Sequence, residues 1–227
     1  MLREIILDTE TTGLSHVMGD RIVEVACVEL INHVASGKTL QFYCSTDKKI
    51  SEEVVAVHGL TNDFLKDHGS FENQHKKLLD FIKDDILIIH NAEFDLGFIN
   101  NELKIIGKEL IKNEYIDTVQ LARKTLKTRI ANLDYLCRRF SIDLSKRSYH
   151  GALLDCQLLA EVYLELVGGK QTKLELKDAK KIQNTNKDNK IAKKNEVKKI
   201  QIDQEIIDSH KKFVKNIKNS LWTKLNY

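Results

Sequence analysis

The chain has 227 residues, of which 42% are hydrophobic and 30% charged, and its formal net charge is +3. This length allows one well-buried domain with an appendage, or two small domains. No apolar run approaches the roughly 20 residues that a membrane helix needs, and no signal peptide precedes the first strand. We therefore expect a cytoplasmic protein that does not contact a membrane. Its four cysteines lack CxxC spacing, so free thiols are expected.

The charge is distributed unevenly along the chain. Residues 170–199 carry eleven Lys against four acids, a net of +7, whereas residues 1–169 carry a net of −6. A general DNA-coating protein has its basic patch on the folded part, so this acidic body is not one. If the body acts on nucleic acid, it needs cations to bring two negative partners together.

Hydrophobic periodicity predicts three strands first, and then helices alternating with two further strands. A further helix is expected after Asp117, which can cap it. This order predicts an α/β fold with a mixed five-stranded sheet flanked by helices. The expected strands are 3–8, 21–30, 39–44, 86–89 and 115–116. The other expected helices are 52–58, 71–83, 93–106, 131–140 and 151–167.

The chain after the predicted domain, 1–169, divides into two parts. Residues 170–200 are rich in Lys and Asn and nearly free of large apolar groups, which predicts a flexible linker. Within 201–227, apolar residues recur at helical spacing, which predicts a C-terminal helix over 203–222. One apolar-faced helix has no core of its own, so it must dock on the body or on a partner.

Two carboxylates end the first strand, in LDTETTGL (residues 7–14). Asp8 and Glu10 are two positions apart on a strand, so their side chains share a face. The threonines and the glycine of this stretch also suit a turn. Taken alone, the pair is explained somewhat better by a solvated strand end than by a site.

Two later stretches add acids near helix starts. HNAEFDLGF (90–98) places Asp95 in the first turn of a helix, where the helix dipole also favours it. YHGALLDCQLLAE (149–161) places His150 just before a helix and Asp155 one turn inside it. A lone histidine there is usually structural. A carboxylate among apolar side chains, however, needs a cation or hydrogen bond to offset its desolvation.

Four carboxylates on separate elements can converge on one spot. Such a set of hard oxygen ligands suits Mg²⁺ or Mn²⁺ rather than zinc. Two such ions clamp the attacking and leaving oxygens of an in-line phosphoryl displacement. An imidazole titrates near neutral pH, so His150 suits the task of taking a proton from the attacking water.

Six stretches, spread over most of residues 3–169, resemble the DEDDh 3′→5′ exonucleases, and within them the proofreading subunits of bacterial replicative polymerases. The resemblance implies a ribonuclease-H-like 3′–5′ exonuclease domain over 1–169. It implies metal ligands Asp8, Glu10, Asp95 and Asp155, with His150 as general base. The sibling subclass has Tyr four positions before the last Asp, where this chain has Gly151. The stretches are LDTETTGL, RIVEVACVEL, VHGLT, HNAEFDLGF, IDTVQLAR and SKRSYHGALLDCQLLAEVYL.

The resemblance also implies a pocket for the 3′-terminal nucleotide of DNA. Asp117 either supports the site from behind or only caps its helix. The product is a nucleoside 5′-monophosphate, and selectivity for mispaired ends comes from how easily they fray. For His58 the alternative is a solvated loop, and for Phe94 it is the core. The implied pocket residues are Thr9, Leu14, Val57, His58 and Phe94.

Two sites on partners follow from the same resemblance. QTKLEL (171–176) looks like the short peptide by which polymerase subunits bind the sliding clamp, with contacts from Gln171, Leu174 and Leu176; the alternative is ordinary linker sequence. The tail resembles the segment that tethers a proofreading exonuclease to its polymerase subunit; the alternative is packing on its own body. Its expected contacts are Ile206, Phe213, Ile217, Leu221 and Trp222.

The sequence therefore predicts the proofreading 3′–5′ exonuclease of a bacterial replicase, acting by two-metal-ion phosphodiester hydrolysis. Two alternatives remain open at this point. One is a DEDDh 3′–5′ exoribonuclease that trims RNA ends and shares the active site. The other is a structural subunit that only stabilises the polymerase. The presence of all four acids and His150 argues against the purely structural role.

Overall fold

The computed structural model describes residues 2–145, 147, 149–168 and 203–216. The chain divides into two units, an N-terminal unit that carries the sheet and a C-terminal unit that carries one helix, α8 (Gln204–Lys215). Among the described residues, no helix has the length and apolar character to cross a membrane. Residues 170–200, the predicted linker, lie outside the described residues.

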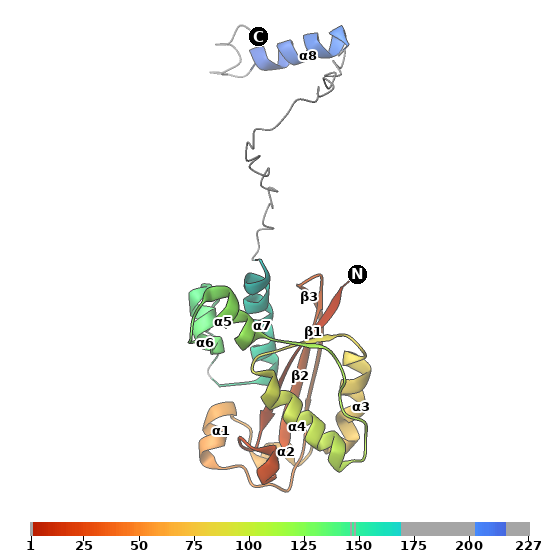
Figure 1. Ribbon diagram of the computed structural model, residues 1–227, viewed down its shortest axis with the longest axis vertical. Helices are drawn as coiled ribbons and strands as arrows, with labels where there is room; N and C mark the ends of the chain where they lie inside the picture. Colours follow the sequence, from red (N-terminus) through yellow and green to blue (C-terminus); the bar gives the residue numbers. More distant parts are fainter. Residues whose placement is uncertain (1, 146, 148, 169–202, 217–227) are drawn as a thin grey trace, which may run out of the picture. The chain divides into compact units, whose positions relative to one another are not determined.

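Five strands form one mixed sheet in the order β3-β2-β1-β4-β5 (Figure 1). The central strand β1 pairs antiparallel with β2 and parallel with β4. At the edges, β3 pairs antiparallel with β2, and β5 pairs parallel with β4. The predicted mixed five-stranded sheet is confirmed. The strands are β1 (Arg3–Thr11), β2 (Ile22–Ile31), β3 (Val34–Tyr43), β4 (Ile86–Ile89) and β5 (Tyr115–Asp117).

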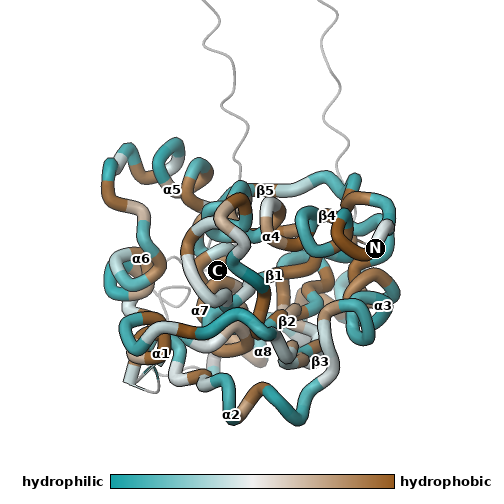
Figure 2. Tube along the Cα trace, turned by 90° about the horizontal axis from the view of Figure 1, so that it is seen from below, coloured by the Kyte–Doolittle hydropathy of each residue, from teal (hydrophilic) through white to brown (hydrophobic). Residues whose placement is uncertain are grey.

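Alternate residues of β1 feed two separate cores, one on each face of the sheet. Ile5 and Leu7 pack with α3 and α4, whereas Ile6 packs with α5, α6 and α7. The surrounding helices alternate hydrophobic and hydrophilic residues along their length, as Figure 2 shows. The helices are α1 (Glu52–His58), α2 (Asn62–Leu65), α3 (Phe71–Ile82), α4 (Ala92–Ile105), α5 (Thr118–Leu126), α6 (Leu133–Arg139) and α7 (Ala152–Val167).

Local signals set the ends of several helices. Gly59 adopts a left-handed φ of 76° and ends α1, as the sequence predicts. Asp117 caps α5, because its side chain accepts a hydrogen bond from the Val119 N–H at 2.8 Å. Asn132 caps α6 in the same way, so this helix begins two residues later than expected. The short α2 and a 3-10 turn over His16–Met18 were not predicted.

Two strand boundaries differ from the prediction by more than one residue. β1 continues to Thr11 instead of ending at Asp8, because β2 pairs with it through Glu10. β3 begins at Val34 rather than at residue 39. Asn32 and His33 have positive φ values of 50° and 69° and form a tight two-residue turn, which extends the hairpin. The first half of β3 is exposed, so it has no alternation for sequence reading to detect.

A buried ion pair joins the start of β2 to α4. Arg21 donates from Nε and Nη2 to Glu102 at 2.7 and 2.6 Å, and Glu102 is buried. Arg21→Met leaves this carboxylate without its cation, and we expect the free energy of unfolding to fall by about 3 kcal/mol. This value is at the low end for a broken buried ion pair, because Arg21 is partly exposed. Urea unfolding measures the loss. The double variant with Glu102→Gln should recover part of it, and a loss below about 1 kcal/mol would match a surface pair instead.

Candidate active site

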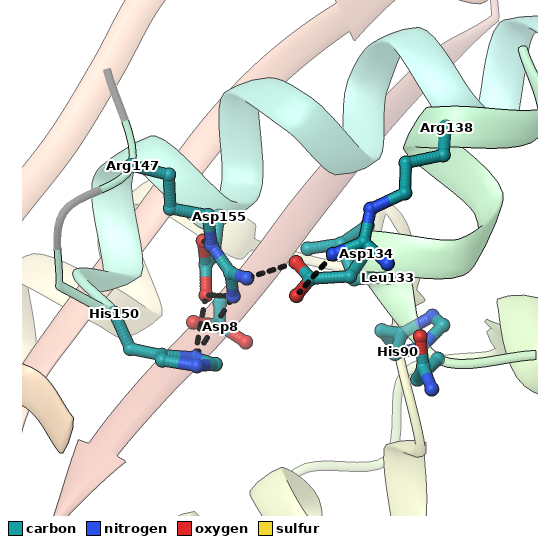
Figure 3. Close-up of a pocket in the computed structure, with 9 residues that line it drawn as sticks. Asp8, His90, Leu133, Asp134, Arg138, Arg147, His150 and Asp155 are labelled. Carbon is teal, nitrogen blue, oxygen red and sulfur yellow. Dashed lines mark hydrogen bonds and ion pairs between the residues drawn. The ribbon is translucent and has the colours of Figure 1, made fainter. Parts of the chain in front are cut away.

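The predicted acids gather at one end of the sheet. Asp8 and Glu10 come from β1, Asp95 from the first turn of α4, and Asp155 from the first turn of α7. Asp8, Asp155 and His150 line one pocket of about 380 Å³. Figure 3 shows Asp155 and His150 pointing toward each other in this pocket, with Asp8 beside them.

The sheet register places Asp8 and Glu10 on one face. They lie opposite Ala26 and Glu24 of β2, on the side where α7 crosses both strands. Helix α7 therefore brings Asp155 to the two strand carboxylates. One atom each of Glu10, Asp155 and His150 lies within 4.8 Å of the others, a spacing that can hold a metal ion.

Asp95 reaches the same end of the sheet from the other side. β4 runs parallel to β1, so the chain leaves β4 and enters α4 next to the end of β1. Asp95 is buried, and its Oδ1 accepts a hydrogen bond from the Thr9 hydroxyl at 2.7 Å. Burial raises the pKa of Asp95 to about 7, although the Thr9 hydrogen bond opposes the shift.

Crowding of negative charge is the main electrostatic property of the site. Burial, followed by the charges of Asp95 and Glu10, raises the pKa of Asp8 well above its ordinary value. Burial and the nearby Glu24 raise the pKa of Glu10 to about 8. A bound divalent cation offsets this repulsion, and carboxylate oxygens are the ligands that Mg²⁺ and Mn²⁺ prefer. The residues present therefore fit the metal that the sequence predicts.

The raised pKa of Glu10 predicts a pH-dependent stability. In the unfolded chain Glu10 loses its proton near pH 4.5, but in the folded protein it keeps the proton to about pH 8. Deprotonation therefore destabilises the folded protein as the pH rises through this window. In EDTA, Glu10→Gln should gain at least about 1 kcal/mol over the wild type between pH 5 and pH 8. Urea unfolding at both values tests this, with the exposed Glu93→Gln as control; an equal difference at both values would contradict it.

His150 lies in the loop before α7, half-exposed at the pocket mouth. Its backbone N–H donates to the Val57 carbonyl at 2.9 Å, which ties the loop to the end of α1. Its ring Nδ1 lies 3.3 Å from Asp155 Oδ2. The imidazole is thus next to the acids and still open to water, as a general base must be.

The predicted nucleotide-pocket residues lie in different environments. His58 is buried beside His150 in a neighbouring cavity, and burial lowers the pKa of its imidazole. Thr9 is buried and hydrogen-bonded to Asp95, and the Phe94 ring packs at a tilt of 49° against Phe98, with 4.9 Å between ring centroids. Leu14 and Val57 are exposed apolar side chains, Leu14 to 87%. Both the core alternative for Phe94 and its expected role are compatible with a half-buried ring.

The sequence patterns did not point to Arg147, which contacts the acid Asp155. Arg147 donates to both oxygens of Asp155, at 2.7 and 2.6 Å, to His150 Nδ1 at 2.8 Å, and to Asp134. It lies three residues before His150, inside the stretch that carries His150 and Asp155. A basic residue so close to a candidate ligand was the signal available.

Glu24 was also missed. It is buried opposite Glu10, where it accepts hydrogen bonds from the Gln41 side chain at 2.7 Å and from the Ala152 N–H at 3.2 Å. Ala152 is the first residue of α7, the helix that carries Asp155. Glu24, on β2, therefore caps the start of this helix. The alternation of RIVEVACVEL placed Glu24 on the face of Ala26 and Val28, which was the signal available.

A mixed α/β sheet with acids converging from β1, α4 and α7 fits a metal-dependent enzyme that cleaves phosphodiester bonds. A family model described as exonuclease matches residues 5–163. The DNA polymerase III epsilon subunit of Rickettsia conorii is 42% identical over 222 residues, covering 95% of this chain and 96% of the relative. That of Escherichia coli K12 is 39% identical over 175 residues, covering 74% and 72%. The chain belongs to this exonuclease family and, within it, to the DNA polymerase III epsilon subunits.

Solved structures agree on the fold. The nuclease domain of 3′hExo, a DEDDh family member bound to rAMP, has a TM-score of 0.65 at 18% identity and covers 73% of this chain and 91% of that one. Exonuclease X in complex with 5′ overhanging duplex DNA has a TM-score of 0.58 at 23% identity and covers 72% and 90%. The predictions of the family, of the ribonuclease-H-like fold class and of a metal-dependent 3′–5′ proofreading exonuclease are confirmed.

Proposed function

We propose that the converging acids hold two divalent cations, Mg²⁺ or Mn²⁺, and that the site removes mispaired nucleotides from the 3′ end of DNA. One observation carries this proposal: four acids that are distant in the sequence meet beside His150. Their mutual repulsion and burial raise the pKa values of Asp8 and Glu10, so the cluster is costly unless a cation binds it. The four acids are Asp8, Glu10, Asp95 and Asp155. When bound, the cations orient the attacking water and stabilise the leaving 3′ oxygen.

The residues of the chain divide the remaining work. His150 takes the proton of the attacking water. The Thr9 hydroxyl fixes the orientation of Asp95, and Glu24 fixes the start of the helix that carries Asp155. Thr9, Leu14, Val57, His58 and Phe94 surround the 3′-terminal nucleotide, of which the exposed Leu14 and Val57 offer apolar surface to a base.

Release of the terminal nucleotide from matched single-stranded DNA and RNA tests the reaction. We expect release from DNA with Mg²⁺ or Mn²⁺ and none in EDTA. Comparing the two ions at equal concentration identifies the one that the site uses. Faster release from RNA would favour an exoribonuclease, and no release from either polymer would favour a structural subunit.

The tail is proposed to tether this nuclease to the polymerase (alpha) subunit of DNA polymerase III, in the cytoplasm. Within α8, Ile206 and Phe213 are 60% and 67% exposed, so the helix presents apolar surface that a partner can cover. The other expected contacts, Ile217, Leu221 and Trp222, lie outside the described residues. So do Gln171, Leu174 and Leu176, which are proposed to bind the sliding clamp.

Truncation after residue 199 should separate tethering from catalysis. Because every proposed active-site residue lies before it, we expect nucleotide release to be unchanged, while co-purification with the polymerase subunit is lost. Deletion of 171–176 alone should keep that co-purification and weaken clamp binding. Retention of the polymerase subunit by the truncated chain would disprove docking through the tail.

A further inference from the structure

Arg147 is a cation that contacts the acidic cluster, as Figure 3 shows. Its side chain is only 9% exposed and comes from the segment between α6 and α7. The guanidinium engages both oxygens of Asp155, at 2.7 and 2.6 Å, in a bidentate pair. It also donates to Asp134, on α6. An arginine keeps its charge at any physiological pH, so this cation is permanent.

The guanidinium contacts two of the three residues whose ligand atoms are spaced to hold a metal ion. Its Nη2 lies 2.6 Å from Asp155 Oδ2 and 2.8 Å from His150 Nδ1, and these two atoms are 3.3 Å apart. Asp155 and His150 are two of the three residues whose ligand atoms gather within 4.8 Å. A divalent cation at this cluster must therefore compete with Arg147 for Asp155.

The same contact determines the tautomer of His150. A guanidinium only donates hydrogen bonds, so His150 Nδ1 must accept the one from Nη2. The neutral ring then carries its proton on Nε2. In this arrangement neither nitrogen has a free lone pair, and the imidazole cannot take a proton from water.

Release of Arg147 reverses this arrangement. Without the guanidinium, His150 can carry its proton on Nδ1, and this N–H can donate a hydrogen bond to Asp155 Oδ2, which is already 3.3 Å away. Nε2 is then free to act as a base, with the carboxylate orienting the ring. Asp134 is partly exposed and also contacts Arg138, at 3.8 Å, so it can keep Arg147 at the rim of the pocket after Asp155 has been given up.

We infer that Arg147 is a positioning residue that couples occupation of the acidic cluster to the tautomer of His150. On Asp155 the guanidinium holds His150 in the tautomer that cannot act as a base, and its displacement by a divalent cation frees Nε2. This inference rests on the proposed roles of Asp155 and His150. It explains why an arginine lies on a carboxylate that the reaction needs for a metal.

Mn²⁺ binding to the full chain tests the competition, with free Mn²⁺ measured by electron paramagnetic resonance. Arg147→Met should bind Mn²⁺ on the order of tenfold more tightly than the wild type, because a competing positive charge next to the site is removed. Arg147→Lys keeps the charge but cannot engage both oxygens and His150 together, so it should lie between the two. Asp134→Asn removes only the second anchor and should tighten binding by a smaller factor.

Several outcomes would overturn the inference. Unchanged or weaker binding by Arg147→Met would show that the guanidinium does not compete. If Arg147→Lys binds Mn²⁺ with the wild-type affinity while Arg147→Met binds it more tightly, the positive charge alone explains the difference, and the bidentate contact of the guanidinium has no role. If Arg147→Met does not fold, unchanged affinity in Asp134→Asn gives the same negative answer. Absence of Mn²⁺ binding in every form would reject the metal site itself, which separates that failure from this one.

Nitrogen-15 NMR of the imidazoles tests the tautomer directly. The spectrum is taken in EDTA at about pH 8.5, roughly two units above the ordinary imidazole pKa, and His150 is identified by the signals missing from His150→Gln. We expect the Nε2–H tautomer in the wild type and a shift to Nδ1–H in Arg147→Met. The same tautomer in both proteins would disprove the coupling, whatever their nuclease activity.

Discussion

Replacing Asp8 with asparagine is expected to lower the rate of nucleotide release from a DNA 3′ end by at least about 10³-fold, since metal ions supply several kcal/mol to such transition states. The negative charges of Asp95, Glu10 and Asp155 all raise the pKa of Asp8, so Asp8 lies close to the other three acids. It is therefore the carboxylate best placed to share a bound cation with the others. Asparagine has the same shape but lacks the charge that holds the cation.

The fold should survive this substitution. The pKa of Asp8 is raised in the folded protein, so its charge opposes folding near neutral pH, and its removal should not lower the unfolding midpoint in EDTA. The wild type should gain thermal stability when Mn²⁺ is added, and Asp8→Asn should lose most of that gain. Asp63→Asn, at a carboxylate that is 93% exposed and outside the pocket, is the matched control. Activity of Asp8→Asn within tenfold of the wild type would exclude Asp8 as a principal ligand.

His150→Gln is expected to lower kcat by about 10²- to 10⁴-fold, the range for a lost general base. Glutamine keeps hydrogen-bonding capacity but cannot take a proton from water. KM should change little, because His150 positions no part of the substrate in this proposal. Single-turnover release at saturating DNA gives the rate, and His75→Gln, a partly buried histidine of α3 outside the pocket, is the control.

The affinity of His150→Gln for Mn²⁺ separates two roles. His150 belongs to the trio of residues spaced for a metal, and it could serve as a ligand instead of a base. A general base leaves Mn²⁺ affinity near the wild-type value, whereas a lost ligand weakens it. Weakened binding together with a raised metal requirement would therefore move His150 from the proton-transfer step to the metal site.

Local sequence determined much of this protein by itself. The run Ile86–Ile89 forms β4 with the predicted bounds, because four consecutive apolar residues fit only a strand buried on both faces. Gly59 and Asp117 ended and capped helices where predicted, because left-handed backbone and side-chain capping depend on a few neighbouring residues. The acids at strand ends and helix starts were visible for the same reason, and so was the family.

Only the tertiary structure decided what depends on partners distant in the sequence. β1 continues through Glu10 because β2 pairs with it there. β3 starts before the predicted residue because a tight turn pairs its exposed first half, which has no apolar alternation, with the end of β2. The alternation of RIVEVACVEL gave the face on which Glu24 lies but not its partners, and Arg147 carried no periodic signal. Glu24 has its role because the start of α7, 128 positions away in the sequence, packs against it. Arg147 has its role because the fold brings the Asp155 carboxylate to the loop that carries it. Residue type and local spacing predicted which acids form the site. Long-range packing determined which charged groups lie next to each acid, and therefore the pKa values.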